Sequence, residues 1–160
     1  MLYTMQNFLV LAGAFVAIAI IVSRIINKKR SWKNFKLLDG EKVEYEENGV
    51  RVNFDAKPRN TFVKANVKVT NKRIIILALN IFDKQGTVWW VFDYSAPVEG
   101  NLADTFSGQY YMDKKDIRME KGKDGKEYFY VEGKMAQKVY TYSLRFPISD
   151  SSKLKKIVGF

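Results

Sequence analysis

The pattern of apolar and polar residues divides this chain into two unequal parts. Residues 2–26 are almost continuously apolar, and residues 8–22 contain neither a charged nor a polar side chain. A helix of about 20 residues rises about 1.5 Å per residue, so it spans a hydrocarbon core of about 30 Å. The pattern therefore predicts a transmembrane anchor over residues 1–27, a linker over 28–36 and a folded domain over 37–160.

Basic residues follow the apolar stretch, whereas Met1–Asn7 carries no charged side chain. Flanking Lys and Arg side chains stay preferentially on the cytoplasmic side of a membrane. We therefore expect a single-pass protein of the cell's inner (plasma) membrane, with its N-terminus outside and its C-terminal domain in the cytoplasm. A cleaved signal peptide would instead begin with basic residues and have a shorter apolar stretch, and a buried core helix would keep a polar face.

Aromatic and basic residues alternate in the linker. Aromatic rings favour the headgroup region of a bilayer, and lysines are attracted to anionic lipid there. We therefore expect the linker to lie on the anionic inner leaflet, the alternative being a plain tether. The predicted headgroup contacts are Lys28, Lys29, Arg30, Trp32, Lys33 and Lys36.

Beyond Leu38 the pattern is typical of β-strands joined by turns. Residues 62–70 alternate between small apolar and polar side chains, as in a half-buried strand. Residues 74–79 are continuously apolar, as in a strand covered on both faces. Further strands are predicted over 43–45, 50–54, 88–94, 117–120, 127–131 and 138–146, with turns at Asn48-Gly49 and Asp124-Gly125 and a stop at Pro147.

The chain ends in a predicted amphipathic helix. Asp150 or Ser151 can cap its first turn, and Leu154, Ile157 and Val158 share one face. Residues 96–109 show no clear periodicity, which predicts a long loop. About seven mostly antiparallel strands followed by one helix predict a mainly β fold, a small antiparallel barrel with the helix capping one end.

Composition limits the chemistry that the chain can perform. The 160 residues include no histidine and no cysteine. This excludes histidine-based acid–base catalysis, Ser-His-Asp and Cys-His nucleophiles, and Cys/His zinc sites. Carboxylate, lysine or tyrosine chemistry stays open, but the cluster Glu44, Glu46 and Glu47 is typical of an exposed strand edge. We expect no enzymatic activity, no metal and no cofactor.

The net charge of +10 makes nucleic-acid binding a possible function to consider. Beyond the anchor, however, the positive charge is spread thinly and accompanies no recognised nucleic-acid-binding motif. Membrane attachment accounts for the basic cluster around residues 24–36 without a nucleic-acid partner. We therefore expect no nucleic-acid partner.

Two short motifs resemble those of a known family. Residues 37–43 are Leu-Leu-Asp-Gly-Glu-Lys-Val, and residues 69–77 are Val-Thr-Asn-Lys-Arg-Ile-Ile-Ile-Leu. They resemble the opening strand and the Thr-Asn-Lys-Arg hairpin of bacterial PH-like and GRAM-like domains, and the resemblance extends over roughly residues 37–158. It implies a PH-like barrel of seven strands with a C-terminal helix. Such domains are often tethered by one or two membrane helices and bind lipid headgroups, peptides or proteins.

The resemblance also indicates where a ligand would bind. Phosphoinositide-binding members use basic residues of the first hairpin, and this chain lacks their dense Lys/Arg spacing there. The candidate ligand- or partner-binding residues are Arg51, Lys57, Arg59, Lys64, Lys72 and Arg73. A solvated basic face, or ordinary hairpin residues in the case of the last two, is the competing interpretation. Trp89 and Trp90 must point to opposite faces of their strand, one into the core and the other outward.

These observations predict a non-catalytic binding or scaffold module on the cytoplasmic face of the membrane. Its partners would be anionic membrane lipids and a protein partner whose identity the sequence does not give. The alternative is a structural accessory subunit of a larger membrane complex. In that case Gly13 and Ala17 would let two membrane helices approach closely.

Overall fold

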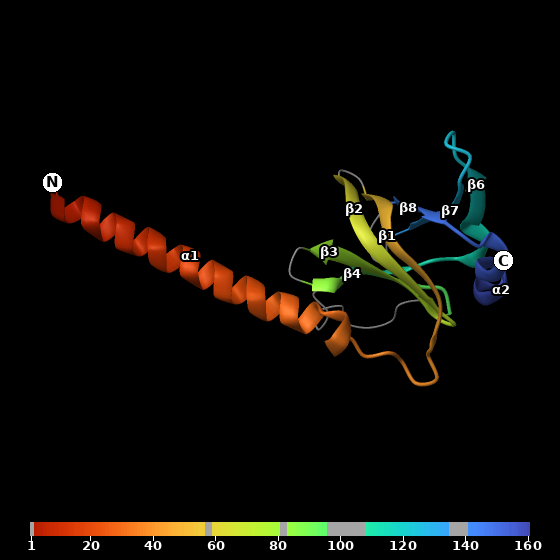
Figure 1. The fold of residues 1–160 in the computed structure, drawn as a ribbon, viewed down its shortest axis with the longest axis horizontal. Helices are drawn as coiled ribbons and strands as arrows, with labels where there is room; N and C mark the ends of the chain where they lie inside the picture. Colours follow the sequence, from red (N-terminus) through yellow and green to blue (C-terminus); the bar gives the residue numbers. More distant parts are fainter. Residues whose placement is uncertain (1, 57–58, 81–82, 96–107, 135–140) are drawn as a thin grey trace.

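The computed structural model describes residues 2–56, 59–80, 83–95, 108–134 and 141–160. A long N-terminal helix, α1 (Leu2–Arg30), leads into a mainly β domain that ends in a second helix, α2 (Ser151–Val158). Figure 1 shows α1 projecting from one side of this domain, with α2 and the C-terminus on the opposite side. The helix and the sheet therefore form two distinct parts joined at one place.

The helix α1 continues past the predicted end of the anchor. Lys28, Lys29 and Arg30 form its last turn, where basic side chains interact favourably with the partial negative charge of the helix C-terminus. Within the described residues, Val10–Arg30 is the one helix long and apolar enough to cross a membrane, and none of its apolar window is buried. A short 3₁₀ helix, η1 (Trp32–Asn34), follows.

Eight strands form one sheet. Their bounds are β1 (Val43–Ala56), β2 (Arg59–Thr70), β3 (Arg73–Asn80), β4 (Asp83–Asp93), β5 (Gly108–Tyr111), β6 (Ile117–Lys121), β7 (Glu127–Lys134) and β8 (Thr141–Ile148). The spatial order is β5-β4-β3-β2-β1-β8-β7-β6. The sheet is curled (Figure 1). It does not close, because β5 and β6 are its two edges and do not pair with each other in the described residues. The mainly β fold with a C-terminal helix is thus confirmed, with eight strands in a half-barrel instead of about seven in a barrel.

The turn predicted at Asn48-Gly49 is wrong. The strand β1 runs through this dipeptide, and its pairing with β2 shifts register between Glu47 and Val50. Gly49 has a positive φ of 66°, and its N–H donates to the side chain of Asn66 on β2 at 2.9 Å. Both halves of β1 pair with the same long strand, so the extra residue forms a β-bulge and the chain does not reverse.

The strand end predicted at Pro147 is also wrong. Pro147 lies inside β8, opposite Tyr128 of β7, and the strand continues to Ile148. Proline is tolerated there because β8 pairs with β1 only from Tyr142 to Arg145, so β1 requires no N–H donor from position 147.

The strand β5 was not predicted. It pairs with β4 in parallel and contains the last two residues, 108 and 109, of the predicted loop over 96–109. Residues 96–107 lie outside the described residues.

The main core fills the concave side of the sheet. Aromatic rings from four strands gather there around Phe54, whose centroid lies 4.7 Å from that of Trp90 and 5.1 Å from that of Tyr110. The helix α2 covers the core with Leu154 and Val158, both fully buried. Its N-cap is Asp150, whose carboxylate accepts from the Lys153 N–H at 2.8 Å. The predicted helix and cap are confirmed.

Candidate functional site

The two motifs that carry the family resemblance meet in the fold. Arg73, at the start of β3, donates from Nε and Nη2 to the two carboxylate oxygens of Glu41, at 2.9 and 2.5 Å. The Thr70 hydroxyl and the Leu38 N–H donate to the same carboxylate, each at 2.7 Å. The side chains of Glu41 and Arg73 are 0% and 8% exposed. Both charges are therefore buried and satisfied within the fold.

This hydrogen bonding changes the acidity of Glu41. Burial alone would raise the pKa of its carboxyl group, but hydrogen bonds from Arg73, Leu38 and Thr70 favour the charged form. The net result is that the pKa of Glu41 lies below its usual value.

The remaining motif residues strengthen the same junction. The Asn71 side chain accepts from the Lys42 N–H and donates to the Gly40 carbonyl, both at 3.1 Å. The Lys72 ammonium donates to the Asp39 carbonyl at 2.7 Å. Lys72 and Arg73, two candidate ligand residues, thus join the segment before β1 to the β2–β3 hairpin.

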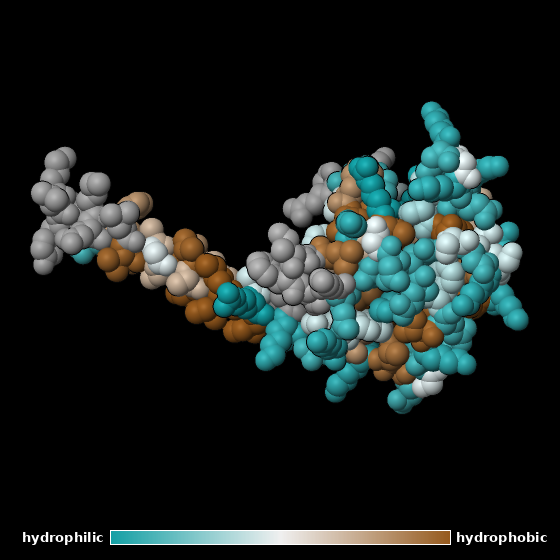
Figure 2. All heavy atoms as spheres, in the orientation of Figure 1, coloured by the Kyte–Doolittle hydropathy of each residue, from teal (hydrophilic) through white to brown (hydrophobic). Residues whose placement is uncertain are grey.

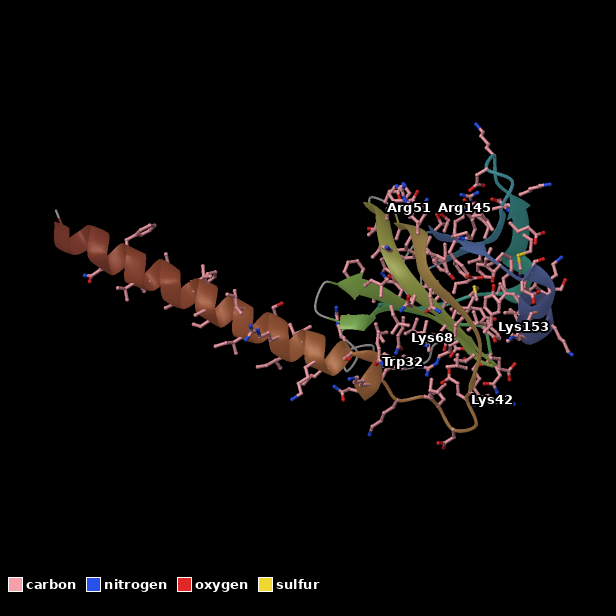
Figure 3. The ribbon with its side chains drawn as sticks, viewed as in Figure 1. Trp32, Lys42, Arg51, Lys68, Arg145 and Lys153 are labelled. Atoms are coloured by element: carbon pink, nitrogen blue, oxygen red, sulfur yellow. The ribbon has the colours of Figure 1, made fainter. Side chains whose placement is uncertain are left out.

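A second group of candidate residues lies on the convex face of β1 and β2. Arg51 and Lys64 are direct cross-strand neighbours. The Arg51 guanidinium lies 4.6 Å from the ring centroid of Phe62, and Phe62 is 53% exposed. We call Arg51, Phe62 and Lys64 the β1–β2 basic patch; Figure 3 labels Arg51 on the edge of the domain away from Trp32 and Lys42.

The β1–β2 basic patch has unbalanced charge. In the described part of the chain, neither Arg51 nor Lys64 has a carboxylate within ion-pair distance. Like charges directly opposite each other in a sheet are unfavourable, so an anionic ligand would relieve their repulsion. Lys57 lies outside the described residues, and Arg59 begins β2 opposite Ala56.

The six predicted headgroup residues divide into two groups. Lys28, Lys29, Lys33 and Lys36 are exposed, whereas Arg30 and Trp32 are partly buried. Trp32 packs against the convex face of β3 and β4 together with Phe35. The role of these residues in headgroup contact stays a prediction.

The two neighbouring tryptophans of β4 differ in exposure, as expected, but they do not point to opposite faces, because their rings touch. Trp90 is 9% exposed and belongs to the core, whereas Trp89 is 38% exposed. Their rings meet edge to face with centroids 5.6 Å apart. The register shift between Ile76 and Leu77 of β3 accommodates Trp89 as a bulged residue.

An open hollow of about 460 Å³ lies over β7 and β8 and brings several carboxyl and hydroxyl groups together. Its lining includes Asp55, Asp116, Glu132, Tyr130, Tyr142 and Ser143. Burial raises the pKa of Tyr142, whose hydroxyl donates to the Tyr111 carbonyl at 2.6 Å, so Tyr142 is not an activated nucleophile. Among the residues that the structure describes, no group of three or more carboxylates is arranged to hold a metal ion.

Sequence reasoning missed two features of these surfaces. It did not place Phe62 beside Arg51, because that requires the β1–β2 register. It also did not place Trp32 and Phe35 on the sheet. The continuous apolar run of residues 74–79 was the available signal. A strand that is apolar on both faces needs a second layer of side chains over its convex face, and Trp32 and Phe35 provide it.

Comparisons with known proteins give one structural match. No protein-family model and no curated protein matches the sequence. Among solved structures, the N-terminal PH domain of Vps36 is similar, with a TM-score of 0.43 and 10% sequence identity. The match covers 78% of this chain and 83% of that chain.

Proposed function

We propose that this protein is a non-catalytic binding module held at the cytoplasmic face of the inner membrane by α1. The observation that carries the proposal is the contrast between its two parts. In Figure 2 the described part of α1 is mostly apolar at its surface, whereas the domain surface is mostly polar. An apolar helix with no protein cover is expected in hydrocarbon, not in water.

The distribution of charge supports the proposed orientation. The basic side chains lie at the domain end of α1, with three of them in its last turn. Cytoplasmic retention of these residues would leave the β domain on the inner side. Attachment by the helix also means that the domain needs only weak contacts with its ligand, since tethering raises the effective concentration.

The β1–β2 basic patch is the proposed recognition surface. It combines two unneutralised cations with an exposed aromatic ring on a rigid pair of strands. Anionic lipid headgroups or carboxylates of a protein partner would both satisfy these cations.

The experiment uses a fragment comprising residues 28–160, which keeps the segment that covers β3 and β4. Its sedimentation with vesicles of phosphatidylcholine alone is compared with its sedimentation with vesicles of phosphatidylcholine and phosphatidylglycerol in equal parts. Both measurements are made at low and at high salt. The variant Arg51→Ser/Lys64→Ser is compared with Lys123→Ser/Lys126→Ser, which removes the same charge from the β6–β7 turn. Lipid recognition by the patch predicts salt-sensitive binding to anionic vesicles that the first variant weakens markedly and the second does not.

Two results would contradict lipid recognition by the β1–β2 basic patch. Binding that both variants weaken equally would show a general charge effect and no role for the patch. A complete lack of vesicle binding by the folded fragment would leave a protein partner as the ligand of the module.

A further inference from the structure

A second apolar cluster lies on the convex face of the sheet. Four aliphatic side chains of β3 and β4 form it, and each is at most 2% exposed. We call Ile75, Leu77, Val88 and Val91 the β3–β4 outer patch. The convex face of a sheet near its edge normally meets solvent, so these side chains would be exposed without a cover.

The cover is the segment that follows the helix, residues 31–36, which we call the strap. Trp32 and Phe35 of the strap pack against the β3–β4 outer patch, with their rings stacked at a centroid distance of 5.7 Å. Figure 3 shows Trp32 and Lys68 on the same side of the sheet. The strap therefore fills a site that the sheet provides for two aromatic rings.

Cations and backbone pairing hold the strap in place. The Lys68 ammonium lies 4.9 Å from the Trp32 ring centroid, and the Arg73 guanidinium lies 5.2 Å from that of Phe35. These are cation–π distances. Ser31 forms an isolated antiparallel bridge with Thr87 of β4. In this state the end of α1 and the sheet are joined as one body.

The same side chains have a second favourable location. The strap directly follows an apolar helix, and Lys33 and Lys36 in it are exposed. Tryptophan and phenylalanine favour the membrane interface, and lysines are attracted to anionic lipid. The two rings cannot contact the sheet and the bilayer at once, so the two locations compete.

We propose that the strap is reversible and responds to the charge of the membrane. On a bilayer poor in anionic lipid it covers the β3–β4 outer patch and holds the sheet to α1. On an anionic bilayer its rings and lysines move to the interface, which uncovers the patch and lets the domain turn on its tether. This inference rests on the proposed membrane anchoring by α1.

The test uses the full-length chain, which has no cysteine of its own. The variant Ser31→Cys/Thr87→Cys is reconstituted into vesicles of phosphatidylcholine, alone or mixed equally with phosphatidylglycerol. Paired residues of an antiparallel bridge are about 4.5–5.5 Å apart at Cα, within the range that a disulfide spans. The initial rate of disulfide formation under mild oxidation measures the fraction of docked strap. We expect it to fall about tenfold or more in the anionic vesicles, at roughly fivefold per lysine attracted to the surface.

Matched variants isolate the cause. Adding Lys33→Gln/Lys36→Gln should keep cross-linking and reduce its dependence on lipid. Adding Trp32→Ala/Phe35→Ala should abolish cross-linking in both lipids, and near-UV circular dichroism of the aromatic core shows whether that variant is folded. A reference pair, Glu120→Cys/Tyr128→Cys, joins cross-strand neighbours of β6 and β7 and corrects for differences in oxidation rate.

The outcomes separate this inference from the proposed function. If the protein resists carbonate extraction but cross-links equally fast in both lipids, the strap is a fixed part of the fold and the inference is overturned. If carbonate extracts the protein from the vesicles, the anchoring itself fails and the inference fails with it. A rate that falls in anionic vesicles, in a carbonate-resistant protein, supports both, whereas a rate that rises there overturns the inference.

Discussion

At the scale of single residues, the most constrained group is the buried pair of Glu41 and Arg73. Burying two charges costs desolvation energy that their attraction offsets only with near-complete hydrogen bonding. Here four donors meet one carboxylate, so the pair joins Leu38 to the β2–β3 hairpin without an unsatisfied charge. Removing one member would leave the other buried and unpaired.

Glu41→Gln is therefore expected to destabilise residues 28–160 by about 3 kcal/mol or more, because the buried Arg73 guanidinium loses its counter-charge. Urea unfolding followed by tryptophan fluorescence measures this loss. Asp113→Asn is the matched control, since Asp113 pairs with Lys115 at the surface and an exposed pair contributes little. Similar unfolding midpoints for the two variants would contradict the structural role of the pair.

The lowered pKa of Glu41 predicts a pH dependence. A group whose pKa is lower in the folded state stabilises that state above its unfolded value, here about 4.5, and loses this contribution as pH falls through the folded value. The stability difference between the native chain and Glu41→Gln should thus be full at neutral pH and shrink below about pH 4.5. A difference that stays constant down to pH 3 would show that Glu41 is not the titrating group.

At the scale of elements, the helix α2 shows how a local signal and its packing combine. Its cap and its apolar face are both visible in the sequence, and the structure uses both. The cap satisfies one backbone N–H at the surface, whereas Leu154 and Val158 fill the core on the concave side of the sheet.

Leu154→Ala is expected to cost about 2–4 kcal/mol, because it leaves a cavity under α2. Asp150→Ala should cost about 1 kcal/mol, the usual value of an N-cap. Urea midpoints of the two variants rank these effects. A larger loss from Asp150→Ala than from Leu154→Ala would mean that α2 is held by its cap and not by its packing.

Local patterns predicted most elements but not their long-range partners. The alternation over residues 62–70 and the apolar run over 74–79 are properties of the strands themselves, and both predictions hold. Asn48-Gly49 favours a turn locally, yet pairing with β2 makes it a bulge. Pro147 fits inside β8 only because β1 does not pair there. The contact of the strap with β3 and β4 likewise depends on non-local register.

The structure brings together some of the residues that the sequence named as candidate ligand contacts, and their binding role stays a prediction. Arg51 and Lys64 were named from the sequence, and the structure makes them neighbours. Lys72 and Arg73 were named with them, but the structure engages both in holding Asp39 and Glu41. A basic side chain has the same sequence signal in either role, so only its partners distinguish a ligand contact from a structural one.

At the scale of the whole molecule, the proposed function requires one orientation of the chain across the membrane. The helix projects from one side of the domain, and α2 lies on the other (Figure 1). If α1 spans the membrane with its basic end inward, the β6–β7 turn and α2 must both lie in the cytoplasm. The proposed roles of the β1–β2 basic patch and of the strap both assume this orientation.

Single-cysteine labelling tests that orientation most directly, because the chain has no cysteine to remove. Lys123→Cys lies in the exposed β6–β7 turn, and Thr4→Cys lies at the opposite end of α1. With a membrane-impermeant maleimide, we expect intact cells to label Thr4→Cys and to leave Lys123→Cys unlabelled until the membrane is opened. Labelling of Lys123→Cys in intact cells would contradict a cytoplasmic location of the β domain.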